Sequence, residues 1–137
     1  MRKYENYAAA LDVLARAPEQ DLANEFVQSG IIDKFSLQFE LGWKLLKPLL
    51  SYEGEAVAAT GSPRDIVKAA AALYEFMDEE TWLSMLRDRN NTTHAYDGNV
   101  AAALVSAIIE RYIPEFERLR AGLLDRYQTM LTAPDRA

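Results

Sequence analysis

The chain contains no cysteine and only one histidine among its 137 residues. Without cysteine there can be no disulfide framework and no thiolate metal site. A single histidine with scattered carboxylates also argues against a transition-metal site, so we expect neither a metal nor another cofactor. An excess of positive charge is missing as well. The formal net charge of −6 argues against general nucleic-acid binding.

Long apolar runs are also missing. No hydrophobic stretch is long enough to span a bilayer, and residues 1–5 lack the apolar centre of a signal peptide. We therefore expect a cytoplasmic protein that makes no membrane contact. Half of the residues are nevertheless hydrophobic, which is enough for a sizeable core. At this length we expect one domain over residues 1–130 and a frayed tail over residues 131–137.

Apolar residues recur at helical spacing along most of the sequence, and no segment shows the two-residue period of a strand. The first expected helix ends at Pro18, and the second runs from its N-cap Asp21 to about Tyr52. The third runs from Ser62 to about Phe76, and the fourth from Met77 to the region 92–96. The last begins at Val100. Short connections between long amphipathic helices favour antiparallel neighbours. The fold class is therefore all-α, an antiparallel up-and-down bundle of four to five helices.

Several residues mark helix ends or interruptions. Ser62 is expected to cap the third helix. Pro48 and Pro114 lie inside expected helices and should kink or bend them. Gly30 and Gly42 lower the helix propensity of the second helix, and we expect the close approach of another helix to explain both.

The most informative segment is residues 89–96, with the sequence Arg-Asn-Asn-Thr-Thr-His-Ala-Tyr. Histidine exchanges protons near neutral pH, and arginine offers a flat fork of donors for phosphate. His94 could therefore take the proton of a ribose 2′-OH while Arg89 stabilises the charge that builds on phosphorus. Five residues along an ideal helix turn about 140° around its axis, so these side chains can converge only where the helix ends or distorts.

Each residue of this segment also has a purely structural interpretation. His94 could cap a helix C-terminus, where its cation suits the helix dipole. Tyr96 could close one end of the bundle, and Asn90 could be a turn or C-cap residue. Asp88 could form an ordinary surface ion pair with Arg87.

A local basic cleft would reconcile an acidic chain with a phosphate ligand. Four basic residues from two neighbouring helical segments could form it, namely Arg64, Lys68, Arg87 and Arg89. The alternative is that they are solvated surface charges. Three polar residues of the second helix could line the same cleft or face solvent, namely Asp33, Gln38 and Glu40. Trp43 and Trp82 are expected to pack rather than to stack on bases.

The spacing of Arg89, His94 and Tyr96 resembles the motif of the HEPN superfamily, in its HepT-like toxin branch that is paired with a minimal nucleotidyltransferase. Asn90 fits as well, because a polar residue often follows the arginine there. Further segments are similar to the helical proteins known as nucleotidyltransferase substrate-binding proteins, namely residues 30–35, 39–44, 62–65 and 82–90. The resemblance covers roughly residues 3–126 and implies a HEPN-like bundle with four main helices.

The resemblance implies a metal-independent endoribonuclease, the toxin of a toxin–antitoxin pair, with Arg89, His94 and Asn90 as catalytic residues. It implies an RNA substrate, a homodimer that brings two Arg–His pairs to one cleft, and a minimal nucleotidyltransferase as antitoxin. Tyr96 would then be the hydroxyl that this partner adenylylates, and the added phosphates would block RNA. One alternative is a non-catalytic substrate-binding or regulatory subunit of a two-component nucleotidyltransferase. A third is a dimeric scaffold.

Overall fold

The computed structural model describes residues 1–92 and 97–134, and every regular element in these ranges is helical. The helices are α1 (Arg2–Leu14), α2 (Glu25–Tyr52), α3 (Val57–Thr60), α4 (Pro63–Leu73), α5 (Glu79–Asn90), α6 (Gly98–Ala107), α7 (Ile113–Arg126) and α8 (Gln128–Thr132). A 3-10 turn (Ala17–Glu19) follows α1, and a π-helical segment (Ile108–Tyr112) joins α6 to α7. This architecture confirms the all-α bundle expected from the sequence. None of the helices in the described ranges has both the length and the apolar character that crossing a membrane requires.

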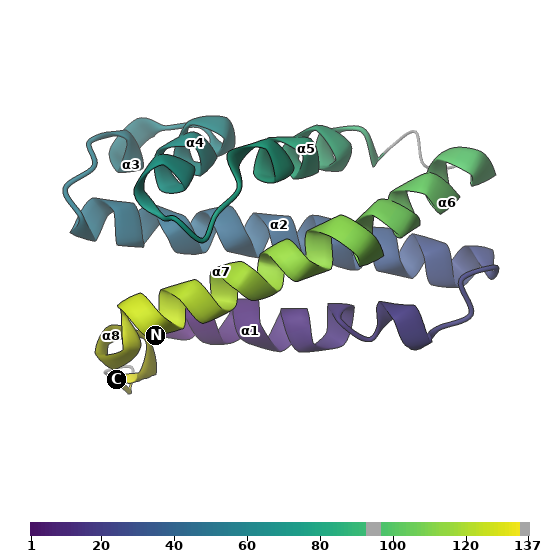
Figure 1. The fold of residues 1–137 in the computed structure, drawn as a ribbon, viewed down its shortest axis with the longest axis horizontal. Coiled ribbons are helices and arrows are strands. Elements are labelled where there is room, and N and C mark those ends of the chain that lie inside the picture. The colour runs from purple at the N-terminus through teal and green to yellow at the C-terminus, as the bar shows by residue number, and fades with distance from the viewer. Residues whose placement is uncertain (93–96, 135–137) are drawn as a thin grey trace.

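The long helix α2 is the centre of the bundle. Figure 1 shows α4 and α5 along one side of it and α1 along another, with α6 and α7 crossing diagonally. Two aromatic contacts tie the layers together: the rings of Phe35 and Tyr112 stack with centroids 5.3 Å apart, and Trp82 meets Phe39 at 5.9 Å. Full burial of one such side chain contributes roughly 1.5–3 kcal/mol. The apolar faces of α2 therefore explain its central position.

The N-cap of α2 is Asn24, so the prediction of Asp21 is wrong. The Asn24 side chain accepts hydrogen bonds from the backbone N–H groups of Phe26 and Val27, at 2.9 and 3.2 Å. Asp21 instead accepts from the N–H of Ala23 in a turn before the helix. Both residue types cap helices well, so the local turn decides between them.

The two glycines inside α2 have different surroundings. A Cβ on Gly42 would lie 3.3 Å from Trp82 and 3.4 Å from Tyr7, so the expected close approach of a neighbouring helix explains this glycine. At Gly30 no atom of the described residues lies within 4 Å of the same position, and the expectation is wrong there. Pro48 does not end α2.

The third predicted helix, α4, has the predicted N-cap Ser62 but ends before the predicted Phe76. The N–H of Asp65 donates to the Ser62 hydroxyl and the N–H of Ser62 donates to the Asp65 carboxylate, both at 3.2 Å. The helix stops at Leu73 because Tyr74 adopts an extended conformation. The hydroxyl of Tyr74 is thereby brought 2.7 Å from that of Tyr127. The segment 53–61, between the expected second and third helices, contains the short helix α3.

The final helix is interrupted where Pro114 limits regular hydrogen bonding. Proline has no N–H to donate, and the π-helical segment lies directly before it. This segment carries Tyr112, which is fully buried. At the C-terminus, α8 buries Leu131, and the N-terminal amine of Met1 donates to the Leu131 carbonyl at 2.9 Å. The domain boundary expected at residue 130 therefore falls inside α8.

Candidate functional site

A groove of about 820 Å³ lies where the start of α4 meets the end of α5. It is lined by Ser62, Pro63, Arg64, Leu83, Leu86, Arg87, Arg89, Asn90 and Asn91. We call it the arginine groove. The two helices are neighbours, and the first turn of α4 lies beside the last turns of α5 at this groove. This is how Arg64, Arg87, Arg89 and Asn90 come to line one groove.

Other residues expected at the cleft lie elsewhere. Lys68 and Asp33 are exposed and do not line the groove. Gln38 is fully buried and donates to the carbonyl of Tyr7 at 3.0 Å, so its amide ties α2 to α1. His94 and Tyr96 belong to residues 93–96, which lie outside the described residues.

Glu40 of α2 holds the guanidinium of Arg89 from the side of the core. Nη2 of Arg89 donates to Oε2 of Glu40, which also accepts from Trp43 Nε1 at 3.0 Å. Lys44 Nζ lies 3.1 Å from the other oxygen, Oε1. Partial burial alone would raise the pKa of Glu40, but the hydrogen bonds from Trp43 and Lys44 and the charge of Arg89 hold that pKa below its usual value. The carboxylate is thus a fixed anchor for Arg89.

Polar side chains from the last turn of α5 lie at the groove. Arg89 Nη1 donates to Oδ1 of Asn90 at 3.4 Å, and the hydroxyl of Thr92 donates to the Arg89 carbonyl at 3.1 Å. Asn91 is the C-cap residue, so the helix ends between Arg89 and the sequence position of His94. An end at this point meets the condition under which these two side chains can approach each other.

A chain of buried and partly buried hydrogen bonds, which the sequence did not predict, supports the last turns of α5. The Tyr112 hydroxyl donates to Asp88 and lies 2.8 Å from the Ser84 hydroxyl, which in turn accepts from Arg87 Nη2 at 3.1 Å. Burial and the hydrogen bond with Asp88 raise the pKa of Tyr112 to about 12. Asp88 therefore binds Tyr112 rather than forming the ion pair considered with Arg87. The only signal in the sequence was the four-residue spacing of Ser84 and Asp88, which places both on one helix face.

The groove has the character of an anion site. Arg64 and Arg87 are exposed, and neither forms an ion pair with a carboxylate of residues 1–92 or 97–134. Guanidinium forks suit phosphate oxygens, and the side chains of Leu83 and Leu86 add apolar surface between them. Across the same described ranges, no group of three His, Cys, Asp or Glu side chains is placed to hold a metal ion.

The family is decided by the sequence of residues 2–125, which matches the family described as nucleotidyltransferase substrate binding protein like. The chain belongs to this family. The match confirms the resemblance drawn from the separate segments, and it contains the whole arginine groove. The family description implies a nucleotidyltransferase as partner. Among curated proteins, no sequence is similar enough to match this chain.

Proposed function

We propose that this member of the family is a metal-independent endoribonuclease of the HEPN type, the toxin of a pair whose antitoxin is a minimal nucleotidyltransferase. One observation carries the proposal. Arg64, Arg87, Arg89 and Asn90 line a single groove. That groove ends where α5 ends, shortly before the residues that hold His94.

The chemistry uses the 2′-OH of the RNA. His94 takes the 2′-OH proton, the 2′ oxygen attacks phosphorus, and the bond from phosphorus to the 5′ oxygen breaks. The departing oxygen receives a proton, which leaves a 2′,3′-cyclic phosphate and a 5′-OH. Arg89 stabilises the charge on the phosphoryl oxygens, and Asn90 positions the phosphate. Removing one such donor costs on the order of a hundredfold in rate. DNA has no 2′-OH and resists cleavage.

The acidic net charge is compatible with this role because the positive charge is local. In a homodimer, two grooves and two Arg–His pairs would serve one cleft, and this doubles the cations that face the RNA. The substrate would then reach the cleft through a positive field on one side of an otherwise acidic molecule.

A cleavage assay tests the proposal. Structured RNA and DNA of the same sequence are incubated with the protein in the presence of a chelator. We expect cleavage of RNA alone, and loss of cleavage in His94→Ala and Arg89→Gln. Arg120→Gln is the matched control, because Arg120 also binds carboxylates and is similarly exposed, at 26% against 29% for Arg89. Equal cleavage by wild type and His94→Ala rejects the proposal.

The same groove suggests how the partner neutralises the toxin. The nucleotidyltransferase transfers an adenylyl group from ATP to the Tyr96 hydroxyl and releases pyrophosphate; each further adenylyl group is added to a ribose hydroxyl of the preceding one, again with release of pyrophosphate. The added phosphates bind Arg89 and exclude RNA. Intact-protein mass after incubation with a minimal nucleotidyltransferase and ATP should rise by multiples of one adenylyl group. Tyr96→Phe should gain no mass. Tyr52→Phe is the control, because it removes a different tyrosine, one that is exposed, and it should gain the full mass.

The second candidate is a non-catalytic subunit that presents a substrate to the nucleotidyltransferase. The family description favours it. In this case the arginine groove would hold the phosphate of the substrate without cutting it. The two candidates differ in one outcome: a protein that leaves RNA intact but raises the turnover of the nucleotidyltransferase supports the second.

A further inference from the structure

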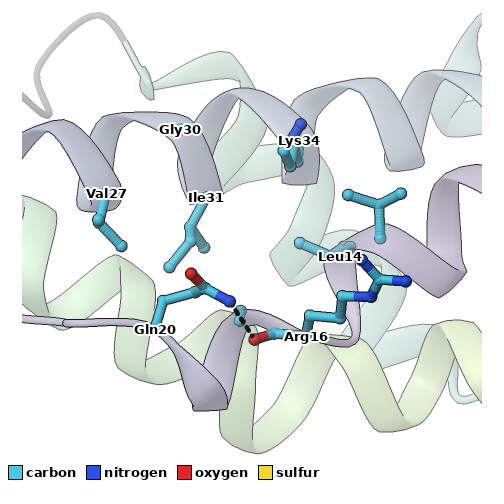
Figure 2. A pocket seen from close by; sticks show the side chains of 9 residues that line it. Leu14, Arg16, Gln20, Val27, Gly30, Ile31 and Lys34 are labelled. Carbon is cyan, nitrogen blue, oxygen red and sulfur yellow. Dashed lines mark hydrogen bonds between the residues drawn. The ribbon is translucent and has the colours of Figure 1, made fainter.

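A second hollow, which shares no residue with the arginine groove, lies between the end of α1 and the first turns of α2. It measures about 300 Å³. Its walls are apolar and include Leu14, Ala17, Val27 and Ile31. Figure 2 shows Leu14 together with Val27, Gly30 and Ile31 of α2 around the hollow. We call it the Gly30 hollow.

No side chain of residues 1–92 or 97–134 packs where a Cβ on Gly30 would stand. Glycine weakens the interior of a helix, so it needs a compensating use. Gly42 has one, because Trp82 and Tyr7 pack where its side chain would be. At Gly30 no atom of the described residues lies within 4 Å of that position, and its φ is not positive. Gly30 lines the hollow, and its missing side chain leaves that space open.

The polar side chains that line the hollow are Arg16, Gln20 and Lys34. Arg16 and Lys34 are exposed, and no carboxylate in residues 1–92 or 97–134 forms an ion pair with either. In Figure 2 Arg16 and Lys34 lie toward one side of the view, and Gln20 lies toward the other. The Gln20 amide is fixed there by donating to the Arg16 carbonyl at 3.2 Å. Apolar walls with a few convergent polar groups are the usual anatomy of a small-molecule site.

We propose that the Gly30 hollow binds a small amphipathic carboxylate with the apolar body of a medium-length acyl chain. The carboxylate lies between Arg16 and Lys34, and the chain crosses Gly30 against Val27 and Ile31. The volume stands near the lower end of the roughly 300–1,000 Å³ found for ligand pockets, which suits such a molecule. This site is independent of the RNA chemistry proposed for the arginine groove.

The competing occupant is an apolar side chain of a second copy. Phe26 stands one turn before Gly30 and is 89% exposed. We favour the small ligand, because the hollow measures only about 300 Å³ and combines two cationic side chains with apolar walls, which a carboxylate with an acyl chain complements. For a second copy to be the occupant, each partner would have to bury about 800 Å² of surface in a stable interface, which is far more than one side chain in the hollow supplies.

The test is a calorimetric titration of the purified full chain with octanoate. We expect saturable binding of one octanoate per chain. Each buried methylene multiplies affinity roughly fourfold, so octanoate should bind on the order of a hundredfold more tightly than butyrate. Octylammonium has the same chain with the opposite charge and should not bind. High salt should weaken octanoate binding, because the head group meets exposed cations.

Variants separate the hollow from non-specific binding. Gly30→Leu fills open space and favours the helix, so it should raise the melting temperature while abolishing octanoate binding. The double variant Arg16→Gln, Lys34→Gln should bind about tenfold more weakly, because the carboxylate loses both cations. Lys47→Gln is the control on α2 outside the hollow and should bind like wild type.

Three results would overturn the proposal. The first is the absence of saturable octanoate binding. The second is equal binding by Gly30→Leu and wild type. The third is a dimer, seen by light scattering, that becomes a monomer in both Gly30→Leu and Phe26→Ser, because the hollow would then belong to a second copy. None of these depends on whether the protein cleaves RNA.

Discussion

Glu40 of α2 and Arg89 of α5 form a hydrogen-bonded ion pair across 49 residues of sequence. The pair fixes one edge of the Arg89 guanidinium against the core and leaves Nη1 directed to Asn90. It also offsets part of the charge of Arg89. Arg64 and Arg87 form no ion pair with a carboxylate of the described ranges, so they supply most of the positive charge that the groove offers to a ligand.

The Glu40 carboxylate should make stability depend on acid pH. Its pKa in the folded chain lies below the ordinary value of 4.5. Its stabilising contribution is therefore fully present above the unfolded pKa and is lost as the pH falls through the lower, folded pKa. For a partly exposed ion pair we expect at most about 1 kcal/mol.

Glu40→Gln tests this contribution. Urea unfolding should show wild type to be more stable at neutral pH, with the difference shrinking between about pH 5 and pH 3. Trp43→Phe, which removes one hydrogen bond to Glu40, should show a smaller difference of the same form. A difference between wild type and Glu40→Gln that stays constant over this range would contradict the prediction.

The arginines of the groove should govern how RNA affinity depends on salt. In a His94→Ala background, which should prevent cleavage, fluorescence anisotropy gives the affinity for a single-stranded oligoribonucleotide. Arg64→Ala and Arg87→Ala should each reduce the slope of log affinity against log salt by about 0.7 for every phosphate that the variant no longer neutralises. Arg118→Ala is the control, because Arg118 pairs with Glu115 and does not line the groove. An equal reduction in that control would show that the groove has no special role.

Tyr112→Phe should disturb the groove as well as the core. The change removes the hydrogen bond to Asp88 and the hydroxyl that orders Ser84 beside Arg87. We expect a decrease of about 1–2 kcal/mol in the free energy of unfolding. Tyr74→Phe is the matched comparison, since it removes another buried tyrosine hydroxyl, far from the groove. Both variants should be less stable, but only Tyr112→Phe should weaken RNA binding.

Gly122→Ala should destabilise the fold through a steric clash with Phe76. A Cβ at this position would lie 2.2 Å from Cγ of the Phe76 ring, which stacks on Tyr74 with centroids 5.0 Å apart. Such overpacking typically costs about 1–3 kcal/mol. In a Phe76→Ala background the same change should be neutral or stabilising, because alanine is the better helix former. A double-mutant cycle measures this coupling, and equal costs in both backgrounds would disprove it.

The helices and their caps show which structural features could be predicted from the sequence alone. Apolar spacing is a local property, so it located the helices, and the Ser62 cap depends only on a residue three positions further along. The prediction of Asp21 as N-cap failed, because Asn24, a residue type that caps helices equally well, follows within one turn. The predicted end at Phe76 failed because the position of Tyr74 depends on Tyr127, which is distant in the chain.

The sequence by itself determined the all-α class, the end of a helix inside a polar segment and the residue types suited to phosphate. Only the tertiary structure decided that Arg64 joins Arg87 and Arg89 while Lys68 does not, and that Glu40 anchors Arg89. The reason is physical: a periodic pattern shows which face of a helix is apolar. It does not fix the rotation and axial offset at which two helices pack, and those two quantities decide which polar side chains meet.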